Sequence, residues 1–512
     1  MLSKVLSSAT HGVDAYKVEV EADIQQQLPY FITVGLPEGA VRESKERVTS
    51  AIKNSDFVFP AKRITINLAP ADRRKEGSAF DLPMAVGILA ATGQIMRDRF
   101  DDYVILGELS LDGALRPVPG ILPMTMSFQK GNGIKGIIVP IENAKEAAIA
   151  QTLPVHPVKS LQDTVHFLED EKTIAPFIID ISAVFNEARQ YPIDFADVKG
   201  QESAKRALEV AAAGGHNIIM IGPPGSGKTM LARRMPSILP DTTLAEALET
   251  TKIHSVAGLL EPNQALIATR PFRSPHHSIS SAGLVGGGSV PKPGEVSLAH
   301  HGVLFLDELP EFRKDILEML RQPMEDNMVT ISRATTSLTY PAGFMLVAAM
   351  NPCPCGYYGD HNHECTCSSG EIQKYMSKIS GPLMDRIDIH ISVPSVKFKE
   401  LSADSHGEKS ELIRARVNRA RKRQLLRFTG EKKMFCNAHM ESRDIRKYCM
   451  IDEKSQSLLS MAISRQGLSA RAYDRILKVA RTIADLAGSD NIEMTHIAEA
   501  VHYRSLDRKL WL

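Results

Sequence analysis

A glycine-rich loop between an apolar run and a helix constrains this chain more than any other segment. Residues 216–221 end as a short apolar strand, and a helix follows from Met230. The loop between them consists of Gly222, Pro223, Pro224, Gly225, Ser226, Gly227, Lys228 and Thr229. This is the complete GxxxxGK(S/T) pattern, in which backbone N–H groups surround phosphate oxygens at the positive end of a helix. It predicts an ATP site at residues 222–230, where Lys228 reaches the β- and γ-phosphates and Thr229 binds Mg²⁺.

Two further apolar runs end in polar residues of the kind that such a site needs. Residues 303–306 are followed by Asp307 and Glu308, so a buried strand delivers two carboxylates at its carboxyl end. We expect Asp307 to bind Mg²⁺ and Glu308 to polarise the attacking water. Residues 344–350 form a third apolar run that ends in Asn351, whose amide is placed to orient that water.

Two arginines complete the predicted catalytic set. Arg386 lies in the segment 381–388, and Arg471 lies at the start of a predicted helix. Charge that develops on a transferred phosphoryl group needs a cation placed from outside the glycine loop. Arg386 resembles the finger that one AAA+ subunit inserts into its neighbour's site, while Asn351 and Arg471 resemble sensors 1 and 2 of the same proteins. The alternative for both arginines is a structural salt bridge.

Length and composition set the broad class of protein. At 512 residues the chain is too long for one compact core, and its 43% hydrophobic and 24% charged residues are ordinary for a soluble globular protein. The net charge of +1 means that nucleic-acid binding would depend on local basic patches. The sequence contains no run of about 18 apolar residues and no basic, apolar leader, so we expect a cytoplasmic protein without a membrane partner.

Periodicity divides the chain into four blocks. Residues 1–170 mix short β-like runs with helical stretches, and residues 171–198 have the weak pattern of a linker. In residues 199–395 strands alternate with helices, which predicts an α/β fold with a parallel sheet. Residues 396–512 have a helical pattern throughout.

Four of the six cysteines fall within one short segment, at Cys353, Cys355, Cys365 and Cys367. Four thiolates can close a tetrahedral Zn²⁺ site, and His361 or His363 between the two pairs could replace one ligand. We therefore expect a structural zinc site. Because the spacing is CxC rather than the usual CxxC, free or redox-active thiols and an Fe–S cluster stay open as alternatives.

Two basic features are candidates for contact with DNA. Residues 328–333 and 337–340 predict a β-hairpin with Arg333 near its tip, and nine Lys or Arg residues stand against two acids in residues 411–433. The alternatives are a solvated turn residue and a solvated helix face. The paired histidines at 276–277 and 300–301 are expected to be hydrogen-bonded interior or interface residues.

Motifs spread over the whole chain resemble those of one family. They occupy residues 34–37, 67–83, 106–109, 468–471 and 503–507. Together with the ATP motifs, they make the chain similar, nearly end to end, to the ComM/YifB family of magnesium-chelatase-like AAA+ proteins. The segment 270–295 resembles the helix-2 insert of magnesium-chelatase motor subunits and MCM helicases. The resemblance implies a Lon-protease-like α+β domain, a P-loop AAA+ core and an all-α carboxy-terminal lid.

The same resemblance implies what the protein does. It implies a hexameric, ATP- and Mg²⁺-dependent DNA motor of the helicase or branch-migration type. Such a motor acts on single-stranded or branched DNA, with recombination proteins as partners, during natural transformation. A chelatase-type motor that drives metal insertion, an ATP-dependent protease and a scaffold that binds ATP without turnover are the alternatives.

The protease alternative depends on the amino-terminal block. Ser78 falls where Lon carries its nucleophile, and Leu122 falls where Lon carries the lysine of its Ser–Lys dyad. The dyad needs an amine to take the hydroxyl proton, and leucine cannot act as a base. We therefore expect this domain to be inactive as a protease, with Lys75 or Lys135 acting by another route as the alternative.

Overall fold

The structure is a computed structural model that places the chain in two compact units. It describes residues 1–95, 99–129, 133–188, 191–261, 264–288, 291–333, 336–360, 363–395, 407–430, 434–466 and 469–506. The first unit comprises residues 1–189 and 244–268, and the second comprises residues 190–243 and 269–512. The segment 244–268, which lies inside the expected AAA+ core, thus groups with the first unit. The four blocks expected from the sequence are finer than this division and stay predictions.

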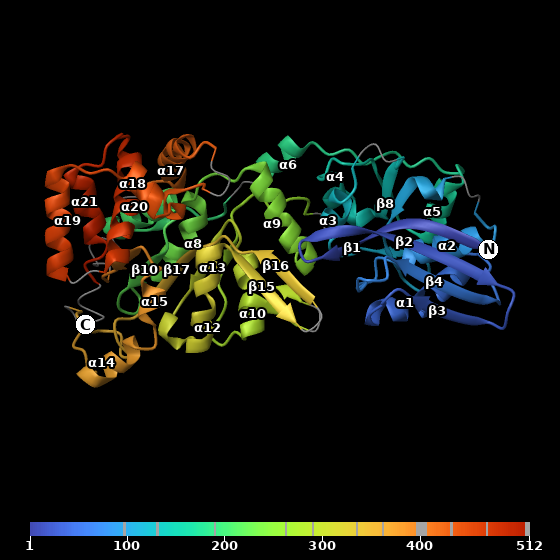
Figure 1. The fold of residues 1–512 in the computed structure, drawn as a ribbon, viewed down its shortest axis with the longest axis horizontal. Helices are drawn as coiled ribbons and strands as arrows, with labels where there is room; N and C mark the ends of the chain where they lie inside the picture. The colour runs from blue at the N-terminus through green and yellow to red at the C-terminus, as the bar shows by residue number, and fades with distance from the viewer. Residues whose placement is uncertain are drawn as a thin grey trace. The chain divides into compact units, whose positions relative to one another are not determined.

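The first unit is built on a seven-stranded mixed sheet in the order β3-β4-β2-β1-β5-β8-β9 (Figure 1). The pairs β1–β2 and β2–β4 are antiparallel, and the other pairs are parallel. Alternate residues of β2 and β4 are buried, as expected for strands with one face on a core. The strands are β1 Leu2–His11, β2 Asp14–Gln25, β3 Tyr30–Val34, β4 Arg63–Ala69, β5 Tyr103–Ile105, β8 Gly136–Pro140 and β9 Val155–Val158.

Helices and a small hairpin complete the first unit. Helix α2 is buried at all eleven of its residues and packs on the apolar face of the sheet. The helices are α1 Gly39–Asn54, α2 Asp81–Ala91, α3 Ile121–Met126, α4 Ala144–Ala148, α5 Leu161–Leu168, α6 Ile181–Glu187 and α9 Leu244–Ala257, with short 3-10 turns at Phe100–Asp102 and Ile141–Asn143. The hairpin strands are β6 Glu108–Leu109 and β7 Leu115–Arg116.

Helix α9 contributes to the core of the first unit, although it is distant in sequence from the rest of that unit. Ala247 in α9 and Leu266 are buried in one apolar cluster with Ile149. The Ser255 hydroxyl donates a hydrogen bond to the buried Glu146 carboxylate. Burial nevertheless raises the pKa of Glu146 above its usual value.

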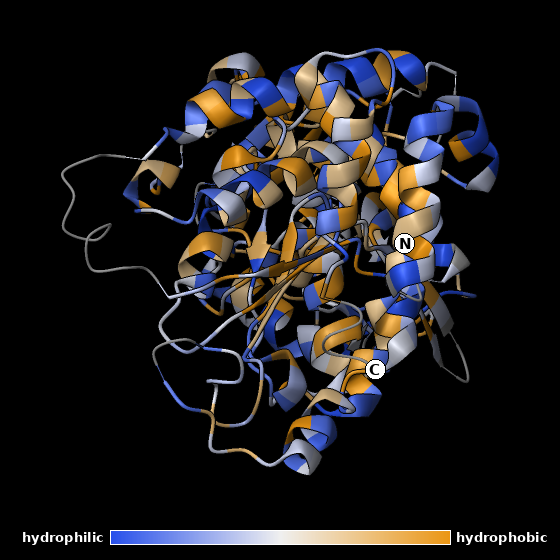
Figure 2. Ribbon diagram, turned by 90° about the vertical axis from the view of Figure 1, so that its left-hand side faces the viewer, coloured by the Kyte–Doolittle hydropathy of each residue, from blue (hydrophilic) through white to orange (hydrophobic). Residues whose placement is uncertain are grey.

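The second unit contains a five-stranded parallel sheet in the order β11-β14-β17-β10-β18, of which Figure 1 labels β10 and β17. This confirms the predicted α/β fold. Every residue of β10, β14 and β17 is buried, because both faces of a parallel sheet are covered. Figure 2 shows strands coloured as hydrophobic in the interior and helices of mixed hydropathy around them. The strands are β10 Ile218–Ile221, β11 Phe272–Arg273, β14 Val303–Leu306, β17 Met345–Met350 and β18 Ile389–Ser392.

Short helices and two hairpins connect the strands of this sheet. The hairpin of β15 and β16 confirms the one predicted from the sequence, and it pairs Arg333 with Thr336 at its last rung. The helices are α7 Glu202–Gly214, α8 Lys228–Ile238, α10 Ser281–Val285, α11 Glu295–Leu298, α12 Lys314–Met319, α13 Arg321–Asp326, α14 Ser369–Met376 and α15 Gly381–Met384. The 3-10 turns are Phe195–Asp197 and Leu309–Glu311, and the hairpin strands are β12 Gly286–Gly287, β13 Lys292–Pro293, β15 Met328–Arg333 and β16 Thr336–Pro341.

The carboxy-terminal part of the second unit is helical, as predicted. Its helices are α17 Ser410–Arg427, α18 Ser442–Tyr448, α19 Glu453–Gln466, α20 Ala470–Ala487 and α21 Met494–His502, with a 3-10 turn at Asn437–His439. Their apolar faces share one continuous core with the parallel sheet. None of the described helices is both long and apolar enough to cross a membrane.

A buried polar network joins the parallel sheet to helix α20. The Asp388 carboxylate, just before β18, accepts a hydrogen bond from Arg475 of α20 and lies 3.2 Å from Nδ1 of His216. Nε2 of His216 lies 2.8 Å from the Thr482 hydroxyl, also in α20. Burial opposes ionisation of Asp388, but Arg475 and His216 outweigh it and hold the pKa of this carboxyl well below its usual range.

We predict that Asp388→Asn lowers the free energy of unfolding of the second unit by about 3 kcal/mol, because the half-buried Arg475 loses the counter-charge of the buried Asp388. Since the folded-state pKa is depressed, the stabilisation is present above the unfolded pKa of about 4 and declines as the pH falls below it. Urea unfolding of the full chain at several pH values measures the difference.

The matched control is Asp490→Asn, because the Asp490 side chain is 93% exposed where it pairs with Arg423. The control should change the free energy of unfolding by no more than about 0.5 kcal/mol. Equal urea midpoints for the two variants at neutral pH would contradict a stabilising role for the Asp388 network.

Candidate functional site

Three adjacent strands of the second unit deliver the predicted ATP motifs to one edge of the sheet. In the parallel register Ile221 at the end of β10 pairs with Met350 at the end of β17, and Leu306 at the end of β14 pairs with Ala348. The residues that follow these strands therefore meet at the carboxyl edge, which is where open α/β sheets bind ligands. Gly222 begins the loop after β10, and a Cβ there would lie 2.1 Å from the carbonyl oxygen of Val393.

Lys228 is the first residue of helix α8 and is only 8% exposed. Its ammonium donates hydrogen bonds to the carbonyl oxygens of Gly222 (2.7 Å) and Pro223 (2.9 Å) within the loop, and to Oδ1 of Asn351 (3.3 Å). Burial lowers the pKa of Lys228, and the charge of Asp307 partly offsets that effect. The cation is thus held inside the loop that is predicted to surround the phosphates.

Thr229 and Asp307 are brought together at the start of α8 and the end of β14. The Thr229 hydroxyl donates to the Asp307 carboxylate at 2.7 Å. Hydroxyl and carboxylate oxygens are the ligands that Mg²⁺ accepts beside phosphate and water. The donor set therefore fits the predicted Mg²⁺ site.

Glu308 lies beside this pair with its side chain 60% exposed. Its backbone is in the left-handed region at φ 51°, a conformation that residues other than glycine rarely adopt. The carboxylate lies 3.7 Å from Nδ1 of His277, which follows β11 in the adjacent part of the sheet. His277 was expected as an interior or interface residue, and its contact with Glu308 was not predicted. The adjacency of β11 and β14 produces that contact.

Asn351 lies directly after β17 and joins the loop to the rest of the site. In addition to the contact with Lys228, the backbone N–H of Asn351 donates to the phenol oxygen of the buried Tyr375, from α14. Burial raises the pKa of Tyr375 well above its usual value. Tyr375 was not identified from the sequence. It lies 24 residues after Asn351, in a later helix, and no local motif marks such a contact.

The two predicted arginines have different environments. Arg386 is 8% exposed, donates to the Glu325 carboxylate and to the carbonyl oxygen of Pro382, and its Nε has no hydrogen-bond partner among the described residues. Arg471, in contrast, has a side chain that is 67% exposed and lies 3.9 Å from the Asp385 carboxylate. Arg386 is therefore held in an ion pair within the chain, whereas Arg471 faces solvent at the start of α20.

The four cysteines lie close together, as the zinc prediction requires. The sulfur of Cys353 is 3.3 Å from that of Cys355 and 3.7 Å from that of Cys365, and all four sulfurs lie within 4.8 Å of one another. This group is made of Cys353, Cys355, Cys365 and Cys367. His363 instead lies 3.9 Å from the Asp360 carboxylate, and His361 lies outside the described residues.

Most arginines of the basic helix α17 are engaged within the second unit. Arg416 pairs with Glu209 and Glu408, and Arg427 pairs with the buried Asp485. Exposed Arg419 and Lys422 leave a smaller basic face on this helix. Lys432, Lys433 and Leu468 lie outside the described residues, and only the backbone of Arg333 is described.

Among the described residues of the first unit, no lysine bonds the serine at the Lon-like position. The Ser78 hydroxyl donates to the Glu108 carboxylate, and Leu122 is fully buried. Lys75 donates to the carbonyl oxygens of Pro70 and Arg73, and Lys135 pairs with Asp102. Lys75 and Lys135, the two lysines considered as replacements for the missing base, therefore bond groups other than Ser78.

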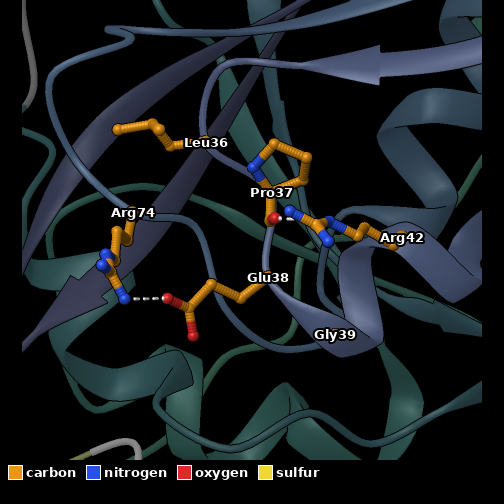
Figure 3. A pocket seen from close by; sticks show the side chains of 6 residues that line it. All are labelled: Leu36, Pro37, Glu38, Gly39, Arg42 and Arg74. Atoms are coloured by element: carbon orange, nitrogen blue, oxygen red, sulfur yellow. Dashed lines mark hydrogen bonds and ion pairs between the residues drawn. The ribbon is translucent and has the colours of Figure 1, made fainter.

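A separate pocket of about 320 Å³ also lies in the first unit (Figure 3). Its lining residues are Leu36, Pro37, Glu38, Gly39, Arg42 and Arg74. Figure 3 shows that Arg74 points at Glu38, with which it forms an ion pair at 2.6 Å. We place the candidate site at the P-loop instead, because the pocket residues offer no arrangement of nucleophile, base or phosphate-binding loop.

Family models match along most of the chain. The model described as "Magnesium chelatase, subunit ChlI" matches residues 194–401. "Subunit ChlI of Mg-chelatase" matches residues 20–143, and "Magnesium chelatase, subunit ChlI C-terminal" matches residues 407–504. The three matches thus include the P-loop sheet, most of the first unit and the carboxy-terminal helices.

Individual proteins match over the full length. The chain is 45% identical to the competence protein ComM of Haemophilus influenzae, over 99% of this chain and 98% of that protein. It is also 45% identical to YifB of Escherichia coli, with the same coverage of both chains. A shorter match to Lon protease 2 of Bacillus subtilis is 32% identical over 157 residues, or 28% of this chain and 27% of that protein. The chain therefore belongs to the ComM/YifB family of Mg-chelatase-like AAA+ ATPases.

Proposed function

We propose that the protein is an oligomeric motor that hydrolyses ATP to move on or remodel DNA. The observation that carries the ATPase part is the meeting of Lys228, the Thr229–Asp307 pair, Glu308 and Asn351 at one edge of the parallel sheet. A P-loop, a hydroxyl–carboxylate pair and a polar strand end are the parts that phosphoryl transfer to water requires.

Each residue has a defined task in this proposal. Lys228 leaves the loop carbonyls to neutralise the β- and γ-phosphates, and Thr229 and Asp307 hold Mg²⁺, which neutralises phosphate charge when bound. Glu308 accepts a proton from the attacking water, and Asn351 orients that water. The Glu308 carboxylate lies 3.7 Å from Nδ1 of His277 and its side chain is 60% exposed, so it has room to turn toward the water.

Two kinds of observation support DNA as the substrate: the similarity to a competence protein, and two basic features of the chain. The matching Haemophilus protein is named a competence protein, and we propose a related role in recombination during natural transformation, as a hexameric helicase or branch-migration motor. The β15–β16 hairpin carries Arg333, and α17 exposes Arg419 and Lys422. Hairpins and basic faces of this kind contact phosphates through salt-sensitive pairs.

The proposed motor uses ATP and metal ions as cofactors, and it has DNA and proteins as partners. ATP and Mg²⁺ act at the P-loop, one structural Zn²⁺ is held by the four cysteines, and the partners are DNA, further copies of the chain and recombination proteins. We propose a cytoplasmic location, where the six cysteines remain thiols.

A chelatase-type motor is the second candidate, because the family models that match the chain describe magnesium-chelatase subunits. Such a motor would respond to a porphyrin-bearing partner rather than to DNA. A protease is disfavoured, since Leu122 stands at the position of the lysine base, and Lys75 and Lys135 bond other groups than Ser78.

We predict that single-stranded or branched DNA stimulates steady-state ATP hydrolysis by the purified full chain, and that Lys228→Ala reduces hydrolysis to background with or without DNA. The reason is that the variant lacks the cation that neutralises the transferred phosphoryl group. Phosphate release at several salt concentrations measures both effects. A hydrolysis rate that no DNA changes, but that a porphyrin-bearing partner raises, would favour the chelatase-type motor.

We predict that Glu308→Gln lowers kcat about 100-fold or more while ATP binding is retained, because the amide cannot accept the proton of the attacking water. Glu311→Gln is the matched control, since Glu311 pairs with Lys378 at the surface of the same segment. Single-turnover hydrolysis and binding of a fluorescent ATP analogue are measured for both variants. Similar losses in both would remove Glu308 from its role as the base.

We predict that Arg386 acts on the ATP bound by a neighbouring subunit after release from Glu325. Arg386→Ala and Lys228→Ala should each be inactive, but a mixture should recover part of the activity, because mixed assemblies contain sites with both residues intact. ATP hydrolysis is followed as the two variants are titrated against each other.

Glu325→Gln separates this role from a purely structural ion pair. If Arg386 is only structural, then Glu325→Gln should damage activity as much as Arg386→Ala, and mixing should recover nothing. If Arg386 acts between subunits, then Glu325→Gln should keep activity, since it frees the arginine.

A further inference from the structure

The four-cysteine group closes a loop that begins and ends at the ATP site. The loop leaves from Asn351, and Cys353 is fully buried two residues later. A tetrahedral site with Zn–S bonds of about 2.3 Å has sulfurs separated by about 3.8 Å. The three described separations among Cys353, Cys355 and Cys365 are 3.3, 3.6 and 3.7 Å, which are close to that spacing.

Backbone amides already point at two of these sulfurs. The N–H of Tyr358 donates to the sulfur of Cys353, and the N–H of Cys355 donates to that of Cys367, both at 3.3 Å. N–H donors stabilise negative charge on sulfur, which is the state that binds metal. The group therefore offers four ligands and the outer hydrogen bonds that orient two of them.

The loop contacts the P-loop at Pro224. Gly356, between the two cysteine pairs, is so close to Pro224 that an added Cβ would lie 2.6 Å from its Cδ and 2.8 Å from its Cγ. Gly356 also has a positive φ of 92°, a conformation that glycine adopts without cost. The loop thus passes over Pro224 at a distance that only glycine permits.

The segment after the cysteines returns to Asn351. Ser368, the residue after Cys367, caps helix α14 in a reciprocal capping box with Glu371. The phenol oxygen of Tyr375, at the far end of α14, accepts a hydrogen bond from the backbone N–H of Asn351. The metal group and α14 together therefore form a closed brace, with contacts at Pro224 on one side and Asn351 on the other.

We propose that a Zn²⁺ ion held by Cys353, Cys355, Cys365 and Cys367 fixes this brace against the P-loop, and so sets the affinity of the site for ATP. This inference rests on the proposed ATP site, which it extends to the residues behind the P-loop. The ion forms four Zn–S bonds with thiolates that have lost their protons to solvent, and no electron is transferred. Gly356 and Tyr375 act as positioning residues, since each reaches the ATP site through another residue, Pro224 for Gly356 and Asn351 for Tyr375.

The first measurement is metal content and ATP affinity of the full chain purified with a thiol reductant. We expect about one zinc per chain, released by a mercurial reagent and detected with a chromogenic chelator. The double variant Cys365→Ser/Cys367→Ser should lose zinc and bind a fluorescent ATP analogue about tenfold more weakly. The control Cys449→Ala should keep both, because Cys449 is buried among the carboxy-terminal helices and is not part of the group.

A glycine pair tests the contact with Pro224 without touching a ligand. Gly356→Ala and Gly359→Ala both place a side chain at a positive φ in the same loop, at 92° and 78°. Only Gly356→Ala meets Pro224, whereas a Cβ at Gly359 meets no described atom within 4 Å. We expect both variants to keep zinc, and only Gly356→Ala to weaken ATP binding, by about fivefold.

The outcomes separate the brace from the ATP site itself. Wild-type protein that binds zinc but no ATP would overturn the proposed ATP site, whereas ATP binding without any zinc would overturn the metal assignment alone. Equal ATP affinity in Gly356→Ala and Gly359→Ala, with zinc retained, would overturn the brace. Iron in place of zinc, seen by its visible absorption, would also overturn the assignment.

Discussion

Strand β17 pairs with β10 on one side and with β14 on the other, and the arrangement of the candidate ATP site depends on this pairing. The strands are parallel and end within two residues of one another in register, so Gly222, Asp307 and Asn351 emerge side by side. A slip of one residue would turn each strand-end side chain to the opposite face. Because all of β14 is buried, a slip that drew Asp307 back into the sheet would bury its carboxylate, which costs free energy.

The charged groups around this site form ion pairs, and the free energy needed to break them differs from pair to pair. The Asp388 network is buried and connects the sheet to α20, so it keeps the helical region and the P-loop sheet in one core. The Glu325–Arg386 pair has one exposed partner, and Arg471 is mostly exposed. Exposed partners are solvated readily, so these two ion pairs cost less free energy to break than the Asp388 network does.

The sequence predicted the parts of the site that follow local rules. The P-loop, the Asp307–Glu308 pair and Asn351 each stand at the end of an apolar strand, so their spacing and polarity were enough to place them together. The contact of His277 with Glu308, the ion pair of Arg386 with Glu325 and the return of Tyr375 to Asn351 could not be predicted. Each joins elements that are far apart in sequence, and single side chains of these types carry no spacing rule. For the same reason, the sequence did not predict that residues 244–268 belong to the first unit.

That membership has a consequence for how the chain is made. Residues 190–243 separate α9 from the rest of the first unit, and Ala247, Leu266 and Ser255 supply part of its apolar cluster and the partner of Glu146. During synthesis, which proceeds from the amino terminus, the first unit cannot complete its core until residue 268 has left the ribosome. By then the P-loop and α8 of the second unit have already emerged. The two units must therefore mature in an interleaved order, and neither can be produced as an intact piece by cutting the chain once.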